Sequence, residues 1–188
     1  MSATTGVRQA GTVAADRHAA YNKTRLFLVS SLALVTAGVA NALRADTATD
    51  LKAVFFDPID SVHSAARLAN VLGVPFLGFA FTIAICSPLL DYINMGLFLR
   101  LAVIFVGGGS VLMAYANTLA TGEGAASMLW YGAIIAGIGW GLVETVINPL
   151  IATLYPDEKA GKLNALHAWW PGGLVIGGLL GVWLSGMG

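Results

Sequence analysis

The sequence predicts an all-α fold, a polytopic membrane helical bundle with about five transmembrane helices. Of its 188 residues, 57% are hydrophobic and only 11% are charged. Soluble domains are typically about 45–50% apolar and about 25% charged. The mean hydropathy is +0.76, and apolar runs long enough to cross a bilayer, at about 20 residues each, recur along the chain.

The first span is expected at about 24–56. Residues 1–22 are rich in Ala, Thr and Gly with scattered charge and no apolar period, so we expect a disordered cytoplasmic tail there. An apolar run covers 26–43, and no helix breaker follows before Pro58. One long helix is therefore expected, as the start of a partial transmembrane domain over 23–188.

The second span is expected at about 58–90. Asp57 followed by Pro58 is typical of an N-cap and the first helical position. Pro75 and Pro88 lie within the span, and we expect them to kink the helix or to be compensated by neighbouring helices.

The remaining apolar runs predict three further spans, at about 95–119, 128–155 and 163–187. Two of these spans carry small residues at four-residue spacing, namely Ala133, Gly137 and Gly141, and Gly173, Gly177 and Gly181. Such spacing places a groove on one helix face, where another helix backbone can approach closely. We interpret both stripes as packing surfaces.

The distribution of basic residues predicts the orientation. Seven of the ten Lys and Arg residues lie on one side of the five spans: Arg8, Arg17, Lys23, Arg25, Arg100, Lys159 and Lys162. The opposite side holds Arg44, Lys52 and Arg67. The positive-inside rule then predicts a cytoplasmic amino terminus. We expect an integral protein of the plasma (inner) membrane.

Composition and motifs disfavour several functions. The net charge is zero, so no nucleic-acid partner is indicated. We find no zinc, phosphate-loop or dinucleotide-binding motif, and we predict no metal and no cofactor. The lone Cys86 is interpreted as a small buried hydrophobe. Because no helix carries a nucleophile with a base or a paired-carboxylate spacing, we do not expect an enzyme, although an intramembrane enzyme stays open as a minor alternative.

Glu144 is the residue most suggestive of function. It lies near the middle of the apolar run 128–154, where an acidic side chain costs roughly 2.5–3.5 kcal/mol. An intramembrane carboxyl is by default a functional site facing the bundle interior, and the alternative is a structural hydrogen bond to another helix. Asn148 follows one helical turn later on the same face, directly before Pro149.

Other polar side chains are candidates for a solute site: Asn41, Arg44, Asp46, Asn164 and His167. For the adjacent charges in the first span, interfacial snorkelling is the alternative. For the two residues in the last span, the alternative is capping and interfacial hydrogen bonding. Trp169 and Trp170 are interpreted as interface anchors, although an aromatic ring facing a cavity can stack on a sugar.

The segment Gly141-Leu-Val-Glu-Thr-Val-Ile-Asn-Pro149, followed by Leu163-Asn164-Ala-Leu-His167, resembles the span 4–span 5 region of the fucose:proton symporter branch of the major facilitator superfamily. Ala40-Asn41-Ala-Leu43 with Asp46 resembles the first helix of that branch. The resemblance implies a protonatable glutamate in span 4, which Glu144 matches, and an acidic residue in span 1, which Asp46 matches approximately. Arg44 has no counterpart in that pattern, which suggests an altered, anionic substrate.

The turn between spans 2 and 3 reads Ser87-Pro-Leu-Leu-Asp91-Tyr-Ile-Asn-Met-Gly96, with Arg100 beyond it. This is a degenerate form of the superfamily's gating motif, in which the first glycine is replaced by serine and the basic cluster is reduced to Arg100. The resemblance implies a gating role for Asp91, Gly96 and Arg100.

The resemblance further implies a twelve-helix transporter of two six-helix halves working by alternating access. The chain matches about five helices of the first half, so we expect a fragment, or a chain that needs its missing second half or a partner chain. The predicted function is proton-coupled symport of a sugar or similar small polar solute across the lipid bilayer. A structural or assembly membrane protein without transport is the main alternative.

Overall fold

The structure is a computed structural model that describes residues 21–186, and this part of the chain is helical without strands. Five helical segments are long and apolar enough to cross a membrane: α2 (Lys23–Asp46), α4 (Ser64–Cys86), α5 (Met95–Ala114), α7 (Glu123–Leu154), and α8 (Lys159–His167) with α9 (Trp169–Ser185). The all-α class and the five spans are thus confirmed, and they are compatible with an integral membrane protein. Most of the expected tail, 1–20, lies outside the described residues.

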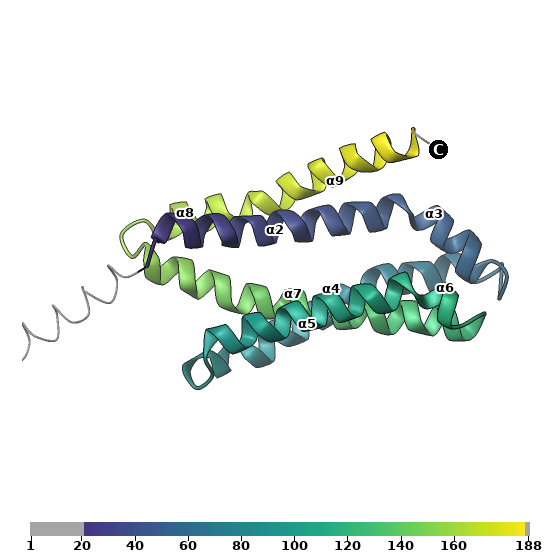
Figure 1. Ribbon diagram of the computed structural model, residues 1–188, viewed down its shortest axis with the longest axis horizontal. Coiled ribbons are helices and arrows are strands. Elements are labelled where there is room, and N and C mark those ends of the chain that lie inside the picture. The colour runs from purple at the N-terminus through teal and green to yellow at the C-terminus, as the bar shows by residue number, and fades with distance from the viewer. Residues whose placement is uncertain (1–20, 187–188) are drawn as a thin grey trace, which may run out of the picture.

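Helix α7 is the centre of one layer of the bundle. It is 32 residues long, and half of its most apolar stretch is buried, against 17–28% for the other spans. Figure 1 shows α4 and α5 packed along it. The close approach to α4 depends on small residues: a methyl group built at Gly137 would lie 2.6 Å from the Cα of Pro75, and one at Gly141 would lie 2.7 Å from the Cβ of Thr82.

The second layer is the pair α2 and α9, with α8 beside them (Figure 1). The predicted glycine stripe of α9 faces α2. A methyl group at Gly173 would lie 3.0 Å from the Cα of Gly38, one at Gly177 would lie 2.7 Å from the Cβ of Ala42, and Gly181 touches the Asp46 side chain. The packing role predicted for both small-residue stripes is confirmed.

The two layers are joined at both ends. At one end, α2, α7 and α8 share a buried apolar cluster of Leu34, Ile147, Ile151, Leu154 and Leu166. At the other end, the short helix α3 (Ala48–Leu51) and the π-helical turn η1 (Lys52–Phe56) lead from α2 to the second layer. There, Phe56 packs into a cluster with residues of α4 and α7, including Val71, Val74 and Leu129. Between these two junctions the layers form a partly open cavity.

The first helical segment differs from the expected single helix over 24–56. Helix α2 ends at Asp46, a turn at Thr47 follows, and α3 and η1 continue to Phe56. The Thr47 hydroxyl donates to the Leu43 carbonyl at 3.0 Å. A threonine that bonds back to a carbonyl one turn earlier often bends a helix, which accounts for the break.

The expected N-cap at Asp57 is wrong, because α4 begins at Ser64. The Asp57 carboxylate instead accepts from Lys52 Nζ at 2.7 Å, and this hydrogen bond lowers the pKa of Asp57 below its usual value. Asp60 accepts the backbone N–H groups of Val62 and His63, at 3.1 and 3.2 Å. Asp60, and not Asp57, therefore stabilises the turn that precedes α4.

The prolines of the second span are accommodated differently. Pro75 lies inside α4, buried against Gly137 of α7, so the neighbouring helix compensates for it as expected. Pro88 lies beyond the end of α4, at the start of the 3-10 helix η2 (Pro88–Asp91). The last span is divided at Ala168 into α8 and α9.

The fourth span begins at Glu123 and not near 128. Gly122 precedes it with a φ of 53°, which permits a sharp turn out of the short helix α6 (Ala116–Leu119). Arg67 of α4 donates to both carboxylate oxygens of Glu123, at 2.7 and 2.9 Å. This ion pair attaches the first turn of α7 to α4.

Candidate functional site

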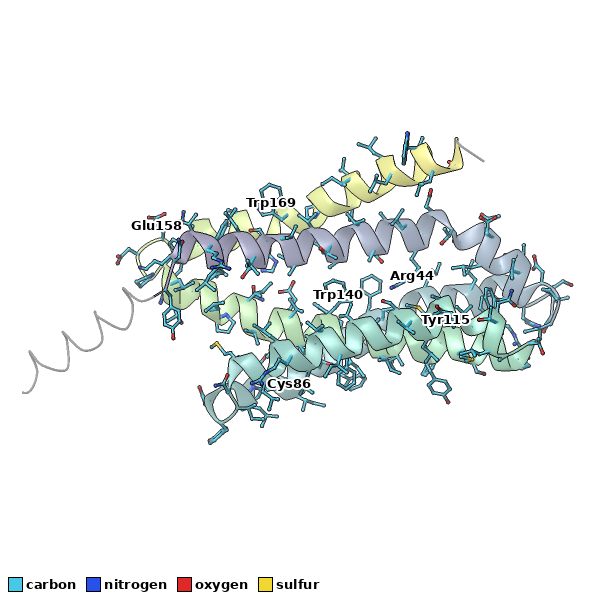
Figure 2. The ribbon with its side chains drawn as sticks, viewed as in Figure 1. Arg44, Cys86, Tyr115, Trp140, Glu158 and Trp169 are labelled. Atoms are coloured by element: carbon cyan, nitrogen blue, oxygen red, sulfur yellow. The ribbon has the colours of Figure 1, made fainter. Side chains whose placement is uncertain are left out.

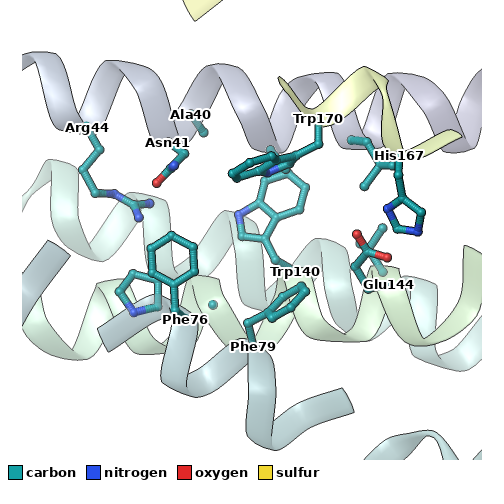
Figure 3. Close-up of a pocket in the computed structure, with 14 residues that line it drawn as sticks. Ala40, Asn41, Arg44, Phe76, Phe79, Trp140, Glu144, His167 and Trp170 are labelled. Carbon is teal, nitrogen blue, oxygen red and sulfur yellow. The ribbon is translucent and has the colours of Figure 1, made fainter. Parts of the chain in front are cut away.

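A cavity of about 360 Å³ lies between the two layers (Figure 3). Its size falls within the range of about 300–1,000 Å³ that is typical of small-molecule sites. Residues from five helices line it: Leu34, Ala37, Ala40, Asn41 and Arg44 of α2, Pro75, Phe76 and Phe79 of α4, Gly137, Trp140, Val143 and Glu144 of α7, His167 of α8, and Trp170 of α9. Its walls are therefore mostly apolar, with a few polar groups.

The sequence spacing explains why these side chains converge. On α2, Leu34, Ala37, Asn41 and Arg44 recur every three or four residues, so they form one stripe along about 15 Å of helix. On α7, Gly137, Trp140 and Glu144 do the same. The cavity is formed where these two stripes face one another.

Aromatic rings separate two polar ends of the cavity. In Figure 3, Trp140 and Trp170 lie between Arg44 with Asn41 on one side and Glu144 with His167 on the other. The Trp170 ring lines the cavity, as in the alternative in which an aromatic ring faces a solute. Its neighbour Trp169 is exposed on the outer side of α9 (Figure 2).

The Glu144 carboxylate lies at one end of the cavity, half-buried, and it accepts a hydrogen bond of 2.8 Å from Asn148 Nδ2. This bond confirms that the two side chains share a face of α7. Asn148 itself does not line the cavity, and its Oδ1 is buried without a partner among the described residues. Asn148 therefore orients the carboxylate of Glu144 from outside the cavity lining, through one of its two oxygens.

Arg44 and Asp46 do not act as a pair. Arg44 lines the cavity, whereas the Asp46 side chain lies against Gly181 of α9 and is exposed. Residues two apart on a helix point to different faces. The structure thus separates a cation in the cavity from an anion outside it, and Asp46 does not join the candidate site.

The remaining predicted residues lie apart from the cavity, with one exception. His167 lines the cavity beside Glu144, but Asn164 of the same helix is exposed. Asp91 is exposed at the end of η2, and Arg100 Nε donates to the Gly96 carbonyl at 3.1 Å. Within residues 21–186, Asp91 and Arg100 form no ion pair. The turn contains a backbone hydrogen bond from Ile93 to the Leu89 carbonyl at 2.8 Å, and Asn94 Oδ1 accepts from the Gly96 N–H at 2.6 Å.

Sequence inspection missed the aromatic lining. Phe76, Phe79 and Trp140 look like ordinary residues of apolar membrane helices. A signal was present for one of them, because Trp140 precedes Glu144 by one helical turn and so shares its face. Nothing in the spacing distinguishes the phenylalanines from those that face lipid.

The fold and site together define an α-helical bundle with membrane-compatible spans and a partly open cavity of small-molecule size between its two layers. Comparisons with protein-family models, with curated proteins and with solved structures found no match. In the part of the chain that is described, no three His, Cys, Asp or Glu side chains cluster in a way that would hold a metal ion.

Proposed function

We propose that the protein is a membrane transporter of the major facilitator type, which carries a small polar solute together with a proton by alternating access. The observation that carries this proposal is the cavity itself. It lies between two helix layers within the apolar spans, and it contains a carboxyl group, Glu144, at one end. Intramembrane acidic residues that face a cavity are typical of proton and solute pathways.

In this mechanism Glu144 carries the proton. A charged carboxylate is costly in a site closed to water, whereas the neutral acid is tolerated there. Protonation therefore favours closure around the solute, and opening to the other side lets water restore the charge and release both. The aromatic rings of Trp140 and Trp170 offer stacking surfaces for the solute, and Asn41 offers an amide for its hydroxyl groups.

The alternative of an assembly protein lacks a comparable observation. Its main support in the sequence is the glycine stripes, and these are already occupied within the chain. The α9 stripe packs against α2, and Gly137 and Gly141 pack against α4. An enzyme would need a second reactive group held against Glu144. His167 lines the same cavity end, but the side-chain hydrogen bond that the Glu144 carboxylate accepts comes from the Asn148 amide.

The proton role is tested with the chain reconstituted in proteoliposomes that contain a pH-sensitive dye. Addition of the transported sugar or sugar acid should acidify the lumen in the wild type and leave it unchanged in Glu144→Gln, which retains solute exchange. Glu158→Gln is the control, because Glu158 is exposed in the loop before α8. Normal proton-coupled uptake by Glu144→Gln would disprove the role of this residue.

A further inference from the structure

Arg44 places a permanent positive charge at the second polar end of the cavity. Its guanidinium group cannot lose its proton in a protein. Asn41, one helical turn earlier, lines the same end. Figure 3 shows both side chains extending from α2 towards α4 and α7, on the opposite side of the tryptophans from Glu144.

No described group neutralises this charge. Within residues 21–186, Arg44 takes part in none of the ion pairs, and no side-chain acceptor bonds to it. The neighbouring Asp46 faces α9. The described cations that lie over aromatic rings are Lys23 and Lys162, at the far end of α2 and in α8. Closure of the cavity without a counter-ion would therefore bury the Arg44 guanidinium unpaired, and the desolvation of an unpaired charge is strongly unfavourable.

We propose that the cavity binds a hydroxylated monocarboxylate, such as a sugar acid, with its carboxylate on Arg44. The planar guanidinium matches a carboxylate with two parallel hydrogen bonds. The hydroxylated body of the ligand then extends past Asn41 to the faces of Trp140 and Trp170. Transport of this ligand rests on the proposed function, whereas its binding depends on Arg44 and the cavity alone.

The charge count selects this ligand over its near relatives. A neutral sugar leaves the guanidinium without a counter-charge. A phosphate ester carries nearly two negative charges at neutral pH, and Arg44 is the one cation among the residues that line the cavity in the described chain, apart from the titratable His167. One carboxylate balances one guanidinium.

The same count predicts an electrically neutral transport cycle. A monocarboxylate that moves with one proton carries no net charge, whereas a neutral sugar that moves with one proton carries one positive charge. The proton binds to Glu144 on one side and leaves on the other, and no covalent bond of the solute changes. Arg44 and Glu144, at opposite ends of the cavity, therefore have separate tasks.

Binding is tested on the full chain in nanodiscs of phosphatidylcholine, by quenching of tryptophan fluorescence. The probes are galacturonate, galactose and galactose 6-phosphate. Galacturonate should bind most tightly, and Arg44→Gln should weaken its binding by about tenfold to a hundredfold, as expected for loss of a charged hydrogen-bond pair. Arg44→Lys should retain part of the affinity. The control Arg25→Gln should retain all of it, because Arg25 is exposed and lies outside the cavity lining.

The inference is overturned if Arg44→Gln binds galacturonate as tightly as the wild type while its melting temperature shows a folded protein. Equal or tighter binding of galactose or of the phosphate ester also overturns it. Loss of galacturonate binding in phosphatidylglycerol nanodiscs would assign Arg44 to a lipid headgroup instead. Arg44-dependent binding without uptake in proteoliposomes would support the site and disprove transport. Proton-coupled uptake that is unaffected by Arg44→Gln would support transport and disprove the role of Arg44 in binding the solute.

Discussion

At the scale of single residues, the pair Glu144 and Asn148 shows how α7 holds a carboxyl group inside an apolar bundle. The amide donates to one carboxylate oxygen at 2.8 Å. The amide's own oxygen is buried without a described partner. A hydrogen bond to a charged group contributes about 1.5–3 kcal/mol, and a buried unpaired polar group costs about 1–3 kcal/mol. The two terms offset one another, so the pair contributes orientation more than stability.

We therefore expect Asn148→Leu to change the free energy of unfolding by less than about 1 kcal/mol. Proton-coupled uptake should fall about tenfold, the equivalent of one lost hydrogen bond of this kind. Chemical unfolding in detergent and proteoliposome uptake measure the two effects. Thr145→Val is the control, because Thr145 bonds to the Gly141 carbonyl within its own helix. A strongly destabilised Asn148→Leu with normal uptake would show that the amide is structural.

At the scale of helices, small residues decide which helices pair. Membrane helices lack a hydrophobic driving force for association, so close van der Waals packing carries the contact. The α9 stripe brings its backbone against α2, and Gly137 brings α7 against Pro75 of α4. Each contact also sets the rotation of a helix about its axis. The α2–α9 contact fixes the face of α2 that carries Arg44 and Asn41.

Gly177→Leu should therefore separate α2 from α9. Even its Cβ would lie 2.7 Å from Ala42 Cβ and 2.9 Å from Val39 Cα, both closer than packing permits. Overpacking of this kind costs typically about 1–3 kcal/mol, and we expect a lower melting temperature and weaker galacturonate binding. Gly178→Leu is the matched control, because a Cβ there meets nothing within 4 Å. Equal melting temperatures for the two variants would show that the α2–α9 contact is not close packed.

At the scale of the whole molecule, two helix layers meet at their ends and form the partly open cavity between them. One layer contributes Asn41, Arg44 and Trp170, and the other contributes Trp140 and Glu144. A ligand that reaches from the guanidinium to the tryptophans would contact both layers. Binding and protonation would then both act on the separation of the layers, which is the coupling that alternating access requires.

The topology of the whole chain gives a further prediction. The loop before α8 holds Asp157, and the turn before α4 holds Ser61. In a Cys86→Ser background, Ser61→Cys should react with a membrane-impermeant maleimide in intact cells. Asp157→Cys should react only after permeabilisation, because the basic residues favour a cytoplasmic amino terminus. Labelling of both positions from one side would contradict the number of spans, and the reverse pattern would contradict the orientation.

The sequence alone determined the helical class, the five spans and the two small-residue stripes. The reason is that the length of an apolar run sets whether a helix can cross a bilayer, and residue spacing sets which side chains share a face. The same reasoning found Glu144 with Asn148 and included Asn41, Arg44 and His167 among the candidates. It placed the helix boundaries less well. The Thr47 hydroxyl bonds back to the Leu43 carbonyl where α2 ends, and Lys52 binds the carboxylate of Asp57, which was expected to cap a helix.

Only the tertiary structure decided which faces look inward. Helices that are apolar all round carry little information about their own rotation, and that rotation is set by the partner against which each glycine stripe packs. For this reason the sequence could not show which of Arg44 and Asp46 lines the cavity and which lies against α9, or which of Trp169 and Trp170 faces inward. The cavity, its aromatic walls and the isolation of the Arg44 charge arise from how the helices pack, and they are properties of no single span.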